Sequence, residues 1–184
     1  MCSSGSLRPT DGEASLMYFM TKKGGMHVPI LSAPCWCPFH DRVPCSDNDH
    51  FEALTAAVFS ARFNPMIVRR RWPSIRQAFA DFHLRDVASW ADSDAEQVLA
   101  YPGMIRSRKK VLATLRNARE LVDKVKIHGS VQSYIASFGT DTQALIDEFD
   151  GWAHYIGAPS IRCYLHCVGR IAADIATDTV RPPC

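Results

Sequence analysis

The chain has 184 residues, of which 47% are hydrophobic, and this is enough apolar material for the core of a domain. Its 21 Lys and Arg residues nearly balance 19 Asp and Glu residues, so the net charge of +2 identifies no partner. No run reaches the roughly 20 apolar residues of a membrane span, and the N-terminus lacks the pattern of a signal peptide. We therefore expect an intracellular protein (cytoplasm or nucleus) with no membrane partner, in which residues 1–34 form a partly disordered arm and residues 35–184 form one domain.

Basic residues are unevenly distributed along the chain. Between Arg62 and Lys126 there are 14 basic and 7 acidic side chains. The basic ones gather in two clusters, which are Arg69, Arg70 and Arg71, and Arg106, Arg108, Lys109 and Lys110. Such clusters can bind phosphates on a nearly neutral chain, although a solvated helix face gives the same pattern.

Apolar residues repeat with a helical period along almost the whole chain, and no segment favours strands. The first expected helix, residues 47–63, begins with Asp and Asn, which are good N-caps. The next starts at Asn64 and Pro65, and Pro73 predicts a break or a new first turn within it. A short helix then follows Ser93, whose spacing to Glu96 is that of a capping box, and Pro102 and Gly103 are expected to end it in a turn.

Further helices are expected at residues 104–122, 130–138, 141–149 and 158–176. In the first of these, an apolar stripe runs along one side, formed by Met104, Val111, Leu115, Ala118 and Val122. We expect the opposite side to face solvent, with Arg106, Lys110, Asn117 and Lys124 on it. Arg108 lies at the edge of the stripe and is either a partnered, half-buried arginine or one held toward a ligand. Short helices joined by Gly and Pro turns predict an all-α, two-lobed fold.

The segment YIGAPSIRC, residues 155–163, places Gly and Pro in a turn between two expected helices. Such a turn presents backbone N–H groups at a helix N-terminus, where the helix dipole favours an anion. It can therefore hold a DNA phosphate without reading a base. The residues predicted to make this contact are Gly157, Pro159, Ser160 and Arg162.

Beyond the last expected helix comes Asp178. The turn followed by this acid resembles the helix-hairpin-helix DNA glycosylase superfamily, whose pattern is a Gly-x-Gly hairpin and a catalytic Asp. Here Pro159 replaces the second glycine, and Val180 replaces a His that follows the Asp.

Two upstream segments resemble the same superfamily in the same order. FEALTAAVFSARFNP, residues 51–65, is similar to its early core helix. ADSDAEQVLAYPGMIRSRKKVLATLRNAREL, residues 91–121, is similar to its Gly-hydrophobic-hydrophobic-Arg-x-Arg-x-Lys helix, in the form seen in 3-methyladenine DNA glycosylase I. The resemblance covers residues 35–184 and implies a two-lobed helix-hairpin-helix glycosylase fold, with the basic cluster at Arg106 and Lys109 as part of a DNA-binding scaffold.

The resemblance also implies roles for single residues. Asp178 would be the catalytic carboxylate, the alternative being that it caps a turn. Arg62 takes the place where many relatives insert a side chain into the duplex. The candidates for stacking on a flipped base are Trp36, Phe39 and Tyr155.

Two positions are informative through their departures from the relatives. Ala57 stands where the type I enzymes carry a glutamate that contacts the excised purine, so this contact is missing. Glu52, on the same helix, is expected to be structural. Ile161 stands where bifunctional relatives carry a lysine nucleophile, which predicts hydrolysis without strand cleavage.

The type I enzymes also hold one zinc ion with Cys and His residues from both chain ends. The corresponding candidates here are Cys35, Cys37, His40 and Cys184. Free thiols are the alternative, because the seven cysteines do not form the pattern of a disulfide framework and indicate a reducing compartment. No cofactor is required for the reaction, and zinc would be structural.

These observations predict a monomeric DNA N-glycosylase that removes a damaged base, an alkylated purine, from duplex DNA by hydrolysis. One alternative is a non-catalytic helix-hairpin-helix module that binds duplex DNA. The other is a helical protein–protein adaptor, which would have no affinity for DNA.

Overall fold

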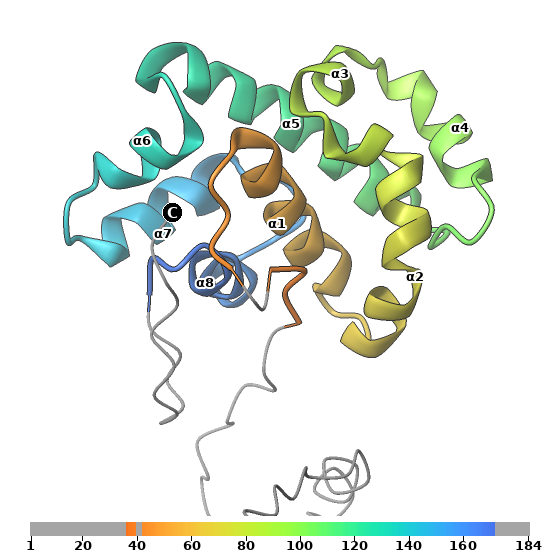
Figure 1. The fold of residues 1–184 in the computed structure, drawn as a ribbon, viewed down its shortest axis with the longest axis horizontal. Coiled ribbons are helices and arrows are strands. Elements are labelled where there is room, and N and C mark those ends of the chain that lie inside the picture. Colours follow the sequence, from red (N-terminus) through yellow and green to blue (C-terminus); the bar gives the residue numbers. More distant parts are fainter. Residues whose placement is uncertain (1–35, 40–41, 172–184) are drawn as a thin grey trace, which may run out of the picture. The chain divides into compact units, whose positions relative to one another are not determined.

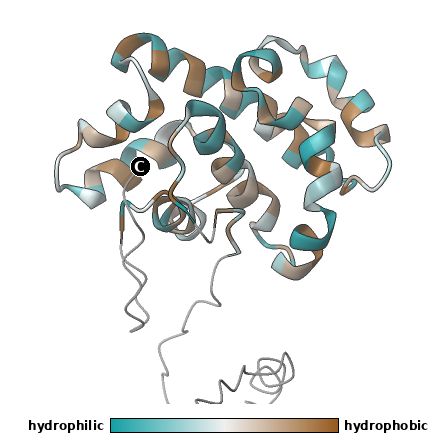
Figure 2. Cartoon of the chain, in the orientation of Figure 1, coloured by the Kyte–Doolittle hydropathy of each residue, from teal (hydrophilic) through white to brown (hydrophobic). Residues whose placement is uncertain are grey.

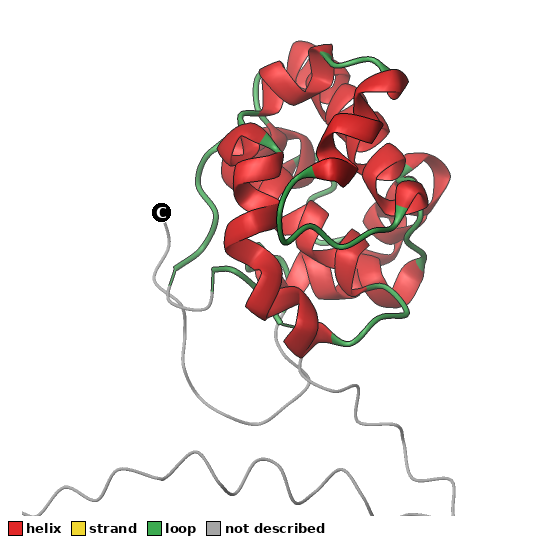
Figure 3. Cartoon of the chain, turned by 90° about the vertical axis from the view of Figure 1, so that its right-hand side faces the viewer, coloured by secondary structure: helices red, strands yellow, loops and turns green. Residues whose placement is uncertain are grey.

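The chain divides into two units, and the computed structural model describes residues 36–39 and 42–171, all of which belong to the second unit, Pro34–Cys184. The regular structure of these residues is entirely helical, as the sequence predicts (Figure 3). None of their helices has both the length and the apolar character needed to cross a lipid bilayer.

Two helices lie between two groups of other helices (Figure 1). The two are α1 (Asp47–Ser60) and α5 (Arg108–His128), which pack against each other. One group contains α2 (Pro65–Ala78), α3 (Leu84–Ser89) and α4 (Ala95–Ala100), with 3-10 turns at Ala80–Phe82 and Asp92–Asp94. The other contains α6 (Val131–Ala136), α7 (Thr142–Trp152) and α8 (Ala158–Cys167). This arrangement agrees with the predicted two-lobed fold.

Helix α1 is buried throughout its central part, from His50 to Phe59. A capping box starts it: the amide of Asp49 donates to the Ser46 hydroxyl at 3.1 Å, and the amide of Ser46 donates to the Asp49 carboxylate at 3.2 Å. Its first turn also caps other helices, since Asp47 accepts a hydrogen bond from the amide of Val131 at 2.8 Å. Helix α1 is thus the core helix, buried along its central part, around which both groups pack.

Two local predictions are wrong. Pro73 does not interrupt α2, because its neighbours Trp72 and Ile75 are buried in the core. Burying each contributes about 1.5–3 kcal/mol, which offsets the roughly 3 kcal/mol cost of an interior proline. Ser93 is not an N-cap either, because the carboxylate of Asp94 accepts a hydrogen bond from the amide of Ala91 at 2.8 Å instead.

The turn between α4 and α5 is formed as predicted by Pro102 and Gly103. Gly103 has φ +81°, and a Cβ added there would lie 2.4 Å from the Ser74 hydroxyl oxygen on α2. Two features therefore require glycine at this position, which are the left-handed backbone conformation and the close approach of α2. Beyond this turn, α5 carries both hydrophobic and hydrophilic residues along its length (Figure 2).

Candidate functional site

Three segments singled out from the sequence meet around Lys110, in the first turn of α5. Its ammonium group donates hydrogen bonds to the carbonyl oxygens of Phe59 and, at 3.0 Å, of Ala61 at the end of α1. The same nitrogen lies 4.9 Å from the centre of the Phe63 ring and 5.7 Å from that of Tyr155, within cation–π range. We call this meeting point the Lys110 junction; it comprises residues 59–63, 106–110 and 153–157.

The prediction that Lys110 faces solvent is wrong, because its side chain is only 3% exposed. The last carbonyl groups of α1 have no partner within their own helix, and the ammonium group supplies one. Burial lowers the pKa of Lys110 to about 8. Lys110 therefore joins the end of α1 to the start of α5.

The same prediction is wrong for Asn117, two turns further along α5, which is also buried. Its side chain makes both hydrogen bonds that an amide can share with one backbone residue. The amide of His154 donates to the Asn117 side-chain oxygen at 2.7 Å, and the Asn117 side-chain nitrogen donates to the His154 carbonyl at 3.3 Å. One polar face of α5 thus holds the end of α1 through Lys110 and the turn between α7 and α8 through Asn117.

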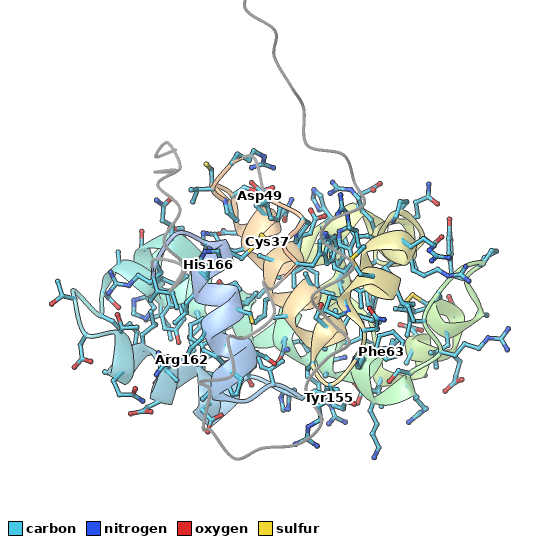
Figure 4. All side chains as sticks on the ribbon, turned by 90° about the horizontal axis from the view of Figure 1, so that it is seen from below. Cys37, Asp49, Phe63, Tyr155, Arg162 and His166 are labelled. Atoms are coloured by element: carbon cyan, nitrogen blue, oxygen red, sulfur yellow. A yellow bond between two sulfur atoms is a disulfide. The ribbon has the colours of Figure 1, made fainter. Side chains whose placement is uncertain are left out.

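The surface of the Lys110 junction combines exposed rings with exposed cations. Phe63 is 39% exposed and Tyr155 is 44% exposed, and both side chains are labelled in Figure 4. Arg62, Arg106 and Lys109 are exposed, and their side chains make no hydrogen bond or ion pair with the residues that the structure describes. Three of the four basic residues predicted to contact DNA, and one of the predicted stacking residues, therefore lie on the segments of this junction, whereas Arg162 does not.

Phe63 is the residue that the sequence reasoning missed here. It was expected to lie in the helix of residues 47–63, but α1 ends at Ser60 and leaves Phe63 in the following loop. Arg62 itself has φ +52° and Tyr155 has φ +69°, a left-handed conformation that costs a non-glycine residue about 1–2 kcal/mol. Two such residues at one junction indicate that the loop and the turn are held by their surroundings.

The turn between α7 and α8 leaves the start of α8 without a side-chain cap. Gly157 is the N-cap residue, and Pro159 lies in the first helical turn, where a proline is tolerated. Ser160 is half-buried, and Arg162 is exposed and lies 3.4 Å from the Gln143 side-chain oxygen. These N-terminal amides could receive an anion, although a carboxylate oxygen of Asp150 would lie only 3.7 Å from a Cβ added at Gly157.

The other predicted stacking residues have different neighbours. Trp36 packs edge-to-face on Trp72 of α2, with ring centres 4.9 Å apart. Phe39 is buried beneath the guanidinium group of Arg42, which lies 4.7 Å from its ring centre. No described contact joins either ring to Tyr155, so the structure does not bring the three stacking candidates together.

Cys37 does not fit a zinc site in this structure, because its sulfur is bonded to that of Cys167 at the end of α8. The disulfide joins residues 130 positions apart. The remaining predicted ligands, Cys35, His40 and Cys184, lie outside the described residues, as does Asp178. Within the described part of the chain, no three side chains that could be ligands are grouped for a metal ion.

Among the described residues, Glu52 is the one carboxylate that is buried, and it is 4% exposed. It accepts hydrogen bonds from the Trp72 indole at 2.9 Å and from the Arg76 guanidinium at 2.6 Å. Both oxygens are therefore engaged between α1 and α2, which agrees with the structural role predicted for Glu52. Ala57, on the same helix, is buried and carries no polar group.

Arg108 follows the first of its two predicted alternatives. Its guanidinium group donates to the Glu96 carboxylate at 2.8 Å. The pair is exposed, with 59% of the arginine side chain accessible, so Arg108 is partnered but not half-buried.

The fold is that of the 3-methyladenine DNA glycosylase I structures. A glutamate-to-glutamine variant of this enzyme from Staphylococcus aureus superposes with a TM-score of 0.67 at 15% identity, over 78% of this chain and 88% of that one. Another structure of 3-methyladenine DNA glycosylase I gives a TM-score of 0.65 at 19% identity, over 77% of this chain and 89% of that one. A further Staphylococcus aureus structure, described as the structural basis of 3-methyladenine recognition, gives 0.67 at 15% identity, over 78% and 87%.

Sequence assigns the family. The model of the methyladenine glycosylase family matches residues 30–156, which is more than half of the chain. The protein therefore belongs to the methyladenine glycosylase family and is a DNA repair glycosylase, as the resemblance implied.

Proposed function

We propose that this glycosylase hydrolyses the N-glycosidic bond of an alkylated purine, such as 3-methyladenine, flipped out of duplex DNA, and leaves the strand uncut. The observation that carries the proposal is the Lys110 junction, whose three segments carry the exposed basic residues Arg62, Arg106 and Lys109 and the exposed rings of Phe63 and Tyr155. Cations attract the phosphate backbone, and aromatic faces stack on unpaired bases. We also propose that the protein acts as a monomer inside the cell, where it has access to genomic DNA.

The lack of a free buried carboxylic acid among the described residues supports an alkylated purine as the substrate. A purine methylated on a ring nitrogen carries a positive charge, so it takes the electron pair of the C1′–N bond and leaves as a neutral molecule without being protonated. The described residues offer no free buried carboxylic acid that could protonate a neutral base, because Glu52 is engaged by Trp72 and Arg76. A site without such an acid can release a base whose C1′–N bond is already weak, as it is in a positively charged purine.

In the proposed reaction, Asp178 stabilises the positive charge that develops on the sugar and takes a proton from the water that adds to C1′. The products are the free base and an abasic sugar. Ile161, where a nucleophilic lysine would be needed for strand cleavage, is buried and apolar. Members of this family need no cofactor, and no step is assigned to zinc.

The test is base release from duplexes that carry alkylated, deaminated or oxidised bases, by the parent protein and by its Asp178→Asn variant. We expect the parent to release an alkylated purine and the folded variant to bind the same duplex without releasing it. Release by the variant at the parental rate would remove Asp178 from the mechanism.

A second candidate, a non-catalytic DNA-binding module, is favoured by one observation, which is the apolar Ala57 on the core helix. For this candidate, the parent would bind duplex DNA in a salt-dependent manner and release no base from any member of the panel.

A further inference from the structure

The polar face of α5 holds together two segments that the proposed function assigns to DNA. Lys110 binds the carbonyl oxygens at the end of α1, immediately before Arg62 and Phe63. Asn117 binds both backbone groups of His154, immediately before Tyr155. The two side chains lie seven residues apart, which places them on the same side of the helix.

Both side chains are buried, and Lys110 is 3% and Asn117 1% exposed. Burying an ammonium group and a carboxamide is unfavourable unless both are hydrogen-bonded. Here each finds its partners on the backbone of another segment, so each fixes where that segment lies relative to α5.

The backbone on both sides needs such support. Arg62, after the first anchor, and Tyr155, after the second, have positive φ values of 52° and 69°. Neither residue is a glycine, so the loop and the turn would relax to other conformations if they were not held. Lys110 also contacts both segments directly, since its ammonium group lies near the Phe63 and Tyr155 rings.

We propose that Lys110 and Asn117 are positioning residues that hold the loop of residues 61–64 and the turn of residues 153–157 at a fixed separation, so that both contact one DNA duplex at the same time. This inference rests on the proposed function for the identity of the ligand. Beyond the proposed function, it holds that Lys110 and Asn117 of α5 set the spacing of the two DNA contacts without touching DNA themselves.

The test compares the parent with Lys110→Met and with Asn117→Asp. The second change keeps the size and the acceptor of the side chain but replaces the donor to the His154 carbonyl by a repelling oxygen. Lys126→Met is the matched control, because Lys126 is an exposed lysine on the same helix whose ion pair, among the described residues, is with Asp123. Affinity for an undamaged and an alkylated duplex is measured over a range of salt concentrations, at a temperature where circular dichroism shows each protein folded.

We expect both variants to bind duplex DNA at least about tenfold more weakly, with a salt slope smaller by about one for each phosphate that the variant no longer binds. Lys126→Met should bind as the parent does. A variant that melts earlier but keeps parental affinity and salt slope would overturn the proposal, because a merely structural residue changes only the melting temperature. If Lys110→Met does not fold, Asn117→Asp decides the result.

Amide hydrogen exchange of the free proteins separates this inference from the proposed function. We expect faster exchange in residues 59–63 of Lys110→Met and in residues 153–157 of Asn117→Asp, with little change elsewhere. Unchanged exchange in these segments would overturn the anchoring role. If the parent binds no duplex at all, the proposed function fails and the DNA role fails with it, whereas the exchange data still show whether the two anchors exist.

Discussion

Replacing Glu52 by glutamine separates a structural carboxylate from a catalytic one. Glu52 is 4% exposed and accepts two hydrogen bonds, at 2.9 Å from Trp72 and 2.6 Å from Arg76. In Glu52→Gln, the amide can keep one of these bonds but must turn its NH2 group toward the donor of the other. Breaking a buried ion pair costs about 3–5 kcal/mol.

The expected loss is smaller than that range, because one hydrogen bond survives and Arg76 is 45% exposed. Water can solvate the released guanidinium group, so we expect the free energy of unfolding to fall by about 2 kcal/mol. Urea unfolding followed by circular dichroism measures this change. Glu96→Gln is the control, since it removes only the exposed pair with Arg108 and should cost at most about 0.5 kcal/mol.

Base release by Glu52→Gln, measured well below its melting temperature, should equal that of the parent per folded molecule. A variant of parental stability would refute the structural role assigned to this carboxylate. A stable variant that loses base release by about a hundredfold or more would show that Glu52, and not Asp178, is the catalytic carboxylate.

Three further predictions follow from single contacts. Gly103→Ala should cost about 1–3 kcal/mol more in unfolding free energy than Gly129→Ala, because both positions have φ above +80° but only the first brings the new Cβ to 2.4 Å from a serine of α2; equal costs would contradict this steric account. Asp150→Asn should raise duplex affinity about two- to fivefold at low salt, because it removes a negative charge beside Gly157; unchanged affinity would argue against a phosphate at this turn. Burial lowers the pKa of His50 to about 4, so the unfolded chain binds more protons between pH 6.5 and 4 and stability falls as the pH drops through this window. Between pH 7 and pH 5 the parent should lose about 2 kcal/mol more than His50→Leu in urea unfolding, and equal losses would refute this assignment.

Most of the helices could be predicted because periodicity and turn residues act locally. The sequence did not predict α3 as a separate helix, and α8 ends at Cys167, earlier than the helix expected at residues 158–176. Pro102 and Gly103 end one helix and precede the next as predicted, because both act through their own backbone conformations. The prediction for Pro73 is wrong because the burial of Trp72 and Ile75, which depends on packing against other helices, outweighs the local cost of the proline.

Helical projection failed at Lys110 and Asn117 for a similar reason. It assigns one apolar side to the core and the opposite side to solvent, but α5 contacts other elements on both sides. A polar residue can be buried on such a helix when backbone groups of another segment need a partner. Those groups become available only through the tertiary fold, so the sequence carries no signal for them.

The candidate site shows the same division. The types of residue could be predicted, since basic clusters and a Gly-Pro turn are visible locally, but the meeting of Arg62, Lys109 and Tyr155 at one junction could not. The bond between Cys37 and Cys167 was not predicted either, because it joins distant positions that share no local spacing pattern.

The central claim, hydrolytic removal of an alkylated purine, is tested most directly by one single-turnover measurement. A methylated duplex is mixed with excess protein, free base is quantified by mass spectrometry, and strand integrity is followed in the same samples. We expect release of a free methylated purine while the strand stays intact until alkali cleaves it at the abasic site. Tight binding without any free base, or strand cleavage that keeps pace with base release, would contradict it.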